Sequence, residues 1–351
     1  MRTIYAALLS LFASLPAFAS TYSGLYFFGD SLTDTGNVTA VYATVPKPPG
    51  APAVKPGAPY FDGRASNGPL YSDVLASGLG LQALPSAQGG NNFAFGGART
   101  RYQLFGPPFL GIGAQVAQFN ARPGPADPNA LYVLWGGSNN LQDILLGRTR
   151  DVFGQPIPGV RATLGDIGGM LASLYAEGAR NLLVPNVPNL GRVPRIGELG
   201  GAPARAAGTF LSKSFNDGLT SLLEGFDAAH PDANLIRFDT FGALEGIAAN
   251  AAGLGLLNLT DRCYTGDDRN FTGGGTVCAN PDSYLFWDGI HPTAFVHKLL
   301  GQAMLGAVAA VPEPSTYATM VLGLLLLGCR RRLTARWQRA SGAIAIAITN
   351  G

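Results

Sequence analysis

The sequence has few cysteines, few histidines and few charged residues, and each shortage excludes a class of function. Its 351 residues include 3 Cys and 3 His, too few and too scattered for a Cys/His zinc site, so we expect no metal and no other cofactor. Charged residues make up only 13%, and the formal net charge of +2 owes part of its value to arginines near the C-terminus. No basic excess remains without them, which excludes nucleic acid as an expected partner.

Residues 1–19 have the pattern of a signal peptide. Arg2 precedes an apolar stretch from Ile4 to Phe12, and Ala17-Phe18-Ala19 is a small-x-small pattern suited to signal peptidase. The alternatives are a retained anchor or a buried N-terminal strand, but the apolar run is short for a membrane span. We therefore expect export, with a mature chain that begins at Ser20.

The C-terminal segment 311–332 also has the pattern of a targeting signal. Val311-Pro312-Glu313-Pro314-Ser315 precedes an apolar run from Tyr317 to Gly328 and then Arg330-Arg331-Arg332. The order resembles the PEP-CTERM sorting signal of Gram-negative bacteria. This resemblance implies an exosortase-type sorting peptidase as partner, a membrane helix before processing, and delivery to the periplasm, cell envelope or extracellular surface.

Two features depart from that pattern. The apolar run is shorter than the ~20 residues of a full span, and a short tail, 333–351, follows the arginines. The alternative is a terminal helix that packs on the domain.

The remaining 20–310 segment is expected to form one domain in which short apolar runs alternate with helical patterns. Alternation of this kind predicts an α/β fold, a parallel five-stranded sheet covered by helices on both faces in a three-layer α/β/α sandwich. The five expected strands are Leu25 to Phe28, Asn92 to Phe95, Ala130 to Trp135, Asn181 to Pro185 and Asn234 to Phe238. The expected helices include Pro69 to Gly78, Ile112 to Asn120, Arg161 to Gly178, Ala204 to Ala229 and Thr293 to Ala309.

A serine follows the first expected strand in Gly29-Asp30-Ser31-Leu32-Thr33-Asp34. A glycine turn there can expose the hydroxyl and aim the Ser31 N–H at a substrate oxygen. Serine needs a neutral imidazole oriented by a carboxylate before it can act as a nucleophile. Asp288 and His291, in Trp287-Asp288-Gly289-Ile290-His291-Pro292, supply both from one turn. The alternatives are a plain helix cap at Ser31 and an ordinary turn histidine at His291.

Two further strands end in paired glycines, in Phe95-Gly96-Gly97-Ala98 and Trp135-Gly136-Gly137-Ser138-Asn139-Asn140. A glycine N–H and an asparagine amide can join the Ser31 N–H as donors to a tetrahedral oxyanion. Each pattern alone is equally typical of a tight strand-to-helix turn.

In the chain the four motifs follow one another as the Ser31 motif, the Gly97 motif, the Asn139 motif and the Asp288–His291 motif. In this order, and with Gly63-Arg64-Ala65-Ser66-Asn67-Gly68-Pro69 after the first of them, they resemble the GDSL, or SGNH, hydrolase family. The resemblance runs from about Tyr26 to His297 and implies a flavodoxin-like fold. It implies the following roles: Ser31 as nucleophile, Asp288 and His291 as the orienting acid and the base, and Ser31, Gly97 and Asn139 as oxyanion donors. One departure is Asn140, where many members have aspartate, so a register slip between Asn139 and Asn140 stays open.

The expected activity is a serine ester hydrolase that cleaves carboxylic esters through an acyl-enzyme on Ser31. The alternatives are a polysaccharide O-deacetylase, a lysophospholipase or a thioesterase of the same fold, and a catalytically inactive surface or matrix protein. Acyl-chain length, alcohol and oligomeric state have no signal in the sequence. Cys263 and Cys278 flank a short loop before Asp288, and in an oxidising compartment they could close a disulfide. The alternative is a pair of free thiols.

Overall fold

The computed structural model describes residues 22–44, 58–102, 110–151, 154–269 and 273–309. By its internal contacts the chain divides into two units, Met1–Ala307 and Val308–Gly351. Almost all of the second unit lies outside the described residues, as do the expected signal peptide 1–19, the sorting segment 311–332 and the tail 333–351. No helix within the described ranges combines the length and the apolar character needed to cross a membrane.

A parallel sheet of four strands forms the centre of the first unit, in the order β1-β2-β3-β4. Its strands are apolar runs with little alternation, as expected where helices cover both faces. All four residues of β2 are buried, and Leu25 pairs with Leu131 at the start of the β1–β2 register. The strands are β1 (Leu25–Phe28), β2 (Leu131–Leu134), β3 (Asn181–Pro185) and β4 (Asn234–Phe238).

The expected fifth strand, Asn92 to Phe95, is wrong as a regular strand, although the segment does lie along the free edge of β1. Phe93 N–H donates to Phe27 O at 2.8 Å, and a single bridge pairs Phe27 with Asn92. The pairing is interrupted because Gly29 N–H donates to Gln115 Oε1 at 2.9 Å instead of to this segment. Phe95 N–H still donates to Gly29 O at 3.2 Å.

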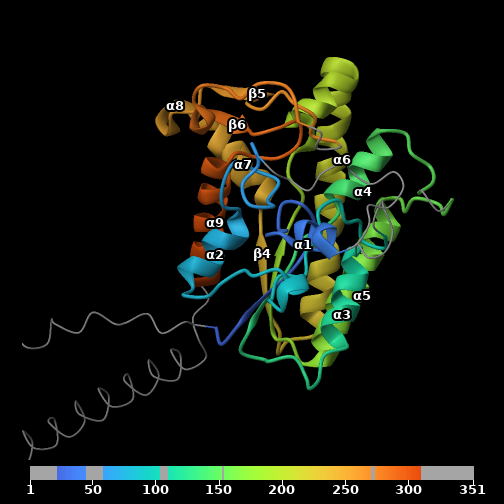
Figure 1. The fold of residues 1–351 in the computed structure, drawn as a ribbon. Helices are drawn as coiled ribbons and strands as arrows, with labels where there is room; N and C mark the ends of the chain where they lie inside the picture. The colour runs from blue at the N-terminus through green and yellow to red at the C-terminus, as the bar shows by residue number, and fades with distance from the viewer. Residues whose placement is uncertain (1–21, 45–57, 103–109, 152–153, 270–272, 310–351) are drawn as a thin grey trace, which may run out of the picture. The chain divides into compact units, whose positions relative to one another are not determined.

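Helices lie on both faces of the sheet, which confirms the α/β class and the layered architecture (Figure 1). On one side α2 packs against α9, and on the other α3, α5 and α6 pack together (Figure 1). The approach of α2 to α9 is close, since a Cβ on Gly301 would lie 2.6 Å from Val74 Cβ. These helices are α2 (Tyr71–Gly78), α3 (Ile112–Asn120), α5 (Val160–Glu177), α6 (Pro194–Ala229) and α9 (Ala294–Ala309).

Several elements differ from the expectation. Helix α6 begins at Pro194, ten residues before the expected Ala204, and bends at Gly200 and Gly201, whose backbone angles are not helical. Further elements had not been expected from the sequence, including a second sheet in which β5 pairs with β6. They are α1 (Asn37–Thr44), α4 (Ser138–Leu145), α7 (Thr240–Ala249), α8 (Ala251–Leu254), β5 (Asn258–Arg262), β6 (Tyr284–Phe286), and the 3₁₀ turns Ser86–Gln88, Leu190–Arg192 and Pro281–Ser283.

Candidate active site

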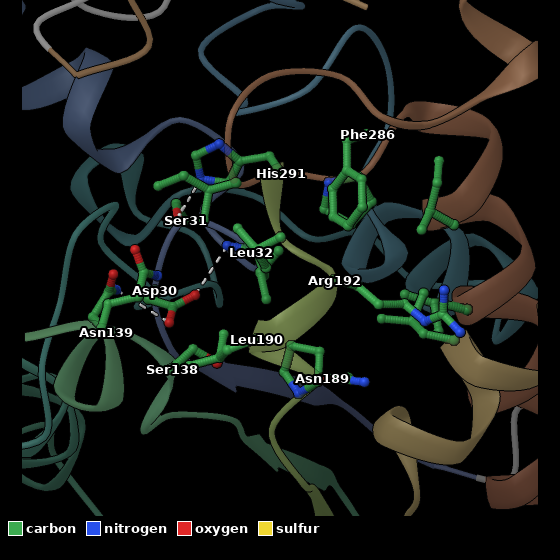
Figure 2. Close-up of a pocket in the computed structure, with 18 of the residues that line it drawn as sticks. Asp30, Ser31, Leu32, Ser138, Asn139, Asn189, Leu190, Arg192, Phe286 and His291 are labelled. Atoms are coloured by element: carbon green, nitrogen blue, oxygen red, sulfur yellow. Dashed lines mark hydrogen bonds between the residues drawn. The ribbon is translucent and has the colours of Figure 1, made fainter. Parts of the chain in front are cut away.

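Ser31 lies on a tight turn directly after β1, at the carboxyl end of the sheet where ligands of such folds bind. Gly29 makes the turn possible, because a Cβ there would lie 2.8 Å from Thr33 Oγ1 and 2.9 Å from Trp135 O. The turn is closed locally by Asp30, whose backbone oxygen accepts Thr33 N–H at 3.0 Å. The Ser31 side chain therefore lines a pocket (Figure 2).

His291 reaches Ser31 across 260 positions of sequence, with Nε2 and Ser31 Oγ 2.8 Å apart. Its other ring nitrogen, Nδ1, lies 2.8 Å from Asp288 Oδ2. The second carboxylate oxygen, Asp288 Oδ1, accepts the backbone N–H groups of Ile290 at 2.8 Å and His291 at 2.7 Å. The three side chains thus form one continuous hydrogen-bonded series that ends in the pocket.

Burial and charge act in opposite directions on the Asp288–His291 pair. Burial opposes protonation of His291, but the Asp288 charge and its hydrogen bond outweigh it, so the pKa of His291 lies above its ordinary 6.5. Burial likewise opposes ionisation of Asp288, whereas the His291 charge and the hydrogen bonds outweigh it and hold the pKa of Asp288 below 3.8. The pair is therefore arranged to stabilise an imidazolium next to a carboxylate.

Asn139 and Asn140 occupy different environments at the start of α4. Asn139 lines the pocket, and its Nδ2 donates to Ala98 O at 3.0 Å and to Asp30 Oδ2 at 3.3 Å (Figure 2). Asn140 is completely buried, and its Oδ1 accepts Thr100 N–H at 3.1 Å. Only the first of the two amides therefore faces the pocket that contains Ser31.

Gly97 lies near the site without lining the pocket. Its φ of +80° requires glycine, and its carbonyl oxygen accepts Arg99 Nη1 at 2.6 Å. Arg99 in turn makes a buried ion pair with Asp143 at 2.8 Å. This network fixes the Gly97 turn, although Gly97 is not among the described residues that line the pocket.

The pocket is a cleft that is partly open to solvent. From Ser31 and His291 it extends towards Phe286 and Arg192 (Figure 2). Asp30, Asn139 and His291 lie on the Ser31 side of the pocket, whereas Arg192 lies towards its other end (Figure 2). Most of the remaining wall is apolar. The apolar lining residues are Leu32, Trp135, Pro188, Leu190, Val193, Leu244, Leu285, Phe286, Ile290, Pro292 and Leu300.

The loop with Asp288 and His291 has supports that carried no signal in the sequence. Asp268, buried beneath it, accepts Gly289 N–H at 2.6 Å and pairs with Arg195 Nη2 at 2.6 Å. Nothing local distinguishes Asp268 from the other acidic residues of its loop, so only the fold shows its contribution.

A disulfide joins Cys263 and Cys278, with a Cα–Cα distance of 4.8 Å. It packs in an aromatic cluster with Tyr60, Tyr264 and Trp287. Trp287 immediately precedes Asp288 in the chain. Among the described residues, no group of three or more His, Cys, Asp or Glu side chains is arranged to hold a metal ion.

Comparisons with solved structures give weak likenesses. A GDSL-like lipase of Bacteroides thetaiotaomicron covers 87% of this chain and 95% of its own at 12% identity, with a TM-score of 0.38. An α/β hydrolase from the metagenome of Lake Arreo, Spain, covers 84% and 99% at 15% identity, with a TM-score of 0.45.

Comparisons of sequence find relatives that match most of this chain. A GDSL esterase/lipase of Arabidopsis thaliana is 26% identical over 89% of this chain and 95% of its own. Acetylajmalan esterase 2 of Rauvolfia serpentina is 26% identical over 81% and 90%. Esterase EstA of Pseudomonas aeruginosa is 29% identical over 95% of this chain and 54% of its own.

Two known sequence families match separate parts of the chain. Residues 310–332 match the PEP-CTERM protein-sorting motif, and residues 25–304 match the GDSL-like lipase/acylhydrolase family. The second match spans most of the sequence, and the chain therefore belongs to the GDSL-like lipase/acylhydrolase family.

Proposed function

We propose that this GDSL-type esterase hydrolyses carboxylic esters through a covalent acyl-enzyme on Ser31. The observation that carries the proposal is the hydrogen-bonded series Ser31–His291–Asp288, which ends in a pocket with apolar walls. A serine hydroxyl next to a carboxylate-oriented imidazole is the arrangement that acyl transfer requires.

In the proposed cycle, Ser31 Oγ attacks the ester carbonyl while His291 Nε2 takes its proton. The resulting imidazolium is stabilised by the buried Asp288 carboxylate. His291 then gives the proton to the leaving alcohol, which leaves the acyl group on Ser31. Water, activated by the same imidazole, releases the acid and restores Ser31.

The oxyanion of each tetrahedral intermediate would be bound by the N–H groups of Ser31 and Gly97 and by the Asn139 amide. Asn139 supports this role because its side chain lines the pocket while Asn140 is buried. Its contact with Asp30 is long, at 3.3 Å, so a substrate oxyanion can replace the carboxylate as acceptor. Preorganised donors of this kind contribute a large share of the rate in acyl transfer.

The walls beyond Ser31 favour an ester whose acyl group is longer than acetyl. Leu190, Leu244, Phe286 and Leu300 line the pocket, and burying methylene groups there contributes about 0.8 kcal/mol each. A deacetylase would leave most of this surface unused. The apolar walls therefore support lipase or esterase activity over O-deacetylation of a polysaccharide.

The PEP-CTERM match gives the chain a sorting signal for export in Gram-negative bacteria. We propose that an exosortase-type peptidase recognises residues 311–332 and that the hydrolase domain acts at the outer side of the cell envelope. The ester substrate would then be an envelope lipid or an extracellular acyl ester.

The test is turnover of p-nitrophenyl esters of increasing acyl length by the wild type and by Ser31→Ala. Ser31→Ala is expected to lose at least about 1,000-fold in kcat because no other nucleophile replaces the hydroxyl. A fluorophosphonate probe should label Ser31 in the wild type alone. Ser221→Ala, at an exposed serine on α6 whose hydroxyl donates to Asp217 O, is the matched control. Wild-type turnover by Ser31→Ala would refute the proposal.

A further inference from the structure

The Tyr60 hydroxyl contacts the carboxylate that orients His291. It donates to Asp288 Oδ2 at 2.8 Å, over a separation of 228 residues. The ring is 6% exposed and packs edge-on against Tyr264 and Trp287, with centroid distances of 5.5 and 6.2 Å. The ring packing leaves the hydroxyl little freedom to turn away from Asp288.

Asp288 Oδ2 therefore has two partners, the Tyr60 O–H and His291 Nδ1, which lies 2.8 Å away. A donor to a carboxylate lowers the negative charge available to its other partner. Burial, followed by the charge of Asp288, raises the pKa of Tyr60 far above its ordinary 10.0. Tyr60 is consequently protonated and able to donate throughout the working pH range.

The segment that follows Tyr60 is tied to the turn that follows His291. Ser66 Oγ donates to Pro292 O at 2.8 Å, and Asn67 Oδ1 accepts Ala294 N–H at 2.8 Å. Gly68 permits the approach, since a Cβ there would lie 2.7 Å from Ala294 Cβ. The Ser-Asn-Gly run, which has no part in the catalytic cycle, thus docks the Tyr60 loop onto the Asp288–His291 loop.

We propose that Tyr60 is a positioning residue that sets the proton affinity of His291 through Asp288. The inference rests on the proposed function for its catalytic meaning. By withdrawing charge from the carboxylate, the hydroxyl weakens the attraction between Asp288 and the imidazolium. A larger fraction of His291 then stays neutral and ready to accept the Ser31 proton.

Other ionisable groups also face this pair, and all of them stay in place when only the Tyr60 hydroxyl is removed. Those that face His291 or Asp288 from neighbouring elements are Asp30, Arg195, Arg262, Tyr264, Asp268 and His297. A change in the titration of His291 after loss of the hydroxyl is therefore attributable to Tyr60.

The test is Tyr60→Phe, which keeps the ring in its cluster and deletes one oxygen. The full-length protein contains only 3 His, so NMR of histidine-labelled protein can follow His291 directly, without substrate. The pKa of His291 is expected to rise by about half to one unit. The acid limb of kcat/KM on a p-nitrophenyl ester should move to higher pH by the same amount.

Tyr132→Phe is the matched control, because its buried ring also loses a hydroxyl, which donates to Asp127 O at 2.9 Å away from the pocket. Ser66→Ala loosens the loop and keeps the Tyr60 hydroxyl, so it should raise the pKa of His291 by less than Tyr60→Phe does. Tyr132→Phe should leave the pKa of His291 unchanged. An unchanged or lowered pKa in folded Tyr60→Phe overturns the proposal, whatever happens to kcat. The NMR titration needs no turnover, so it tests the role of Tyr60 even if Ser31 proves inactive in ester hydrolysis.

Discussion

Ser31 and His291 come from regions of the molecule whose supports differ. Ser31 follows β1, whose Phe27 and Phe28 are completely buried in the sheet, and its turn is closed by Asp30 one residue away. The position of Ser31, the proposed nucleophile, is therefore set by core packing, by hydrogen bonds between near neighbours and by buried bonds such as that from Asn92 Nδ2 to Thr33 O at 2.7 Å.

The loop of Asp288 and His291 follows β6, which pairs with β5 in the small sheet. Besides its local bonds to Asp288 Oδ1, this loop is held by distant groups: Asp268 bonds to Gly289 N–H, and Tyr60 bonds to Asp288 itself. The comparison teaches that the nucleophile inherits its position from the core, whereas the base is held by cross-links. Changes to cross-links should therefore affect the base far more than the nucleophile.

Of the effects compared here, the largest is expected near Ser31, at the two adjacent asparagines of α4. Asn139→Ala should lower kcat by about 100-fold or more, near 3 kcal/mol, because an oxyanion donor is lost. Asn140→Ala should mainly lower stability, by about 1–3 kcal/mol, because Thr100 N–H is left buried without its acceptor. Ester kinetics and urea unfolding of both variants measure the two effects.

Each asparagine variant is the control for the other, since both remove an amide from the same turn of helix. If Asn140→Ala lost the activity while Asn139→Ala kept it, the assignment of the oxyanion donor would be off by one residue.

The disulfide Cys263–Cys278 packs in the aromatic cluster next to the Asp288–His291 loop. Replacing both Cys263 and Cys278 by Ser should lower the free energy of unfolding by about 3 kcal/mol, the value expected for a loop of this length. The two residues are 15 apart and pack against Tyr60, Tyr264 and Trp287. Urea unfolding with and without reductant measures the loss, and Cys329→Ser, which leaves the pair intact, is the control. Equal stability of the double variant and the wild type would contradict the prediction.

The same contrast explains how much of the fold could be predicted from the sequence. The bounds of β3 and β4 agree with their expected apolar runs, because a buried parallel strand is a local pattern. The segment at Asn92 also has the pattern of a strand, but its pairing with β1 is interrupted by Gln115, which lies 86 positions from Gly29 and accepts the Gly29 N–H. A side chain that takes a backbone donor over such a separation leaves no local pattern.

The candidate site divides in the same way. Ser31, His291 and Asn139 lie in short motifs whose residue types suit the chemistry, and the structure brings all three to one pocket. Asp288 lies behind His291, to which it is hydrogen-bonded, and Gly97 does not line the pocket. Tyr60 and Asp268 are ordinary residues in irregular segments, and their contacts with the Asp288 loop exist only in the folded chain. Motifs therefore predicted the candidate reacting groups, and the fold was needed to show which residues hold them.

The smallest expected effect concerns Asp30, beside the nucleophile. Burial raises the pKa of Asp30 from 3.8 to about 6, against the opposing Leu32 N–H bond and the charges of His291 and Arg99. The folded protein therefore binds this proton more tightly than the unfolded chain, so the ionised carboxyl costs stability above pH 6. Asp30→Asn should be more stable than the wild type at pH 8 by about 1 kcal/mol, since the neutral amide gives up part of the gain by losing one acceptor oxygen.

The gain of Asp30→Asn should shrink as pH falls through about 6 and vanish below the unfolded value of 3.8, where both states of the wild type are protonated. Urea unfolding at several pH values measures this. Asp232→Asn is the contrasting control: the Tyr175 hydrogen bond lowers the pKa of Asp232, so that variant should become less stable relative to the wild type as pH rises through the range in which Asp232 ionises. A wild type more stable than Asp30→Asn at pH 8 would show that the Asp30 carboxylate is better solvated than its burial implies. The turn that positions Ser31 would then carry no electrostatic cost, and the nucleophile's side of the site would be stabilised throughout.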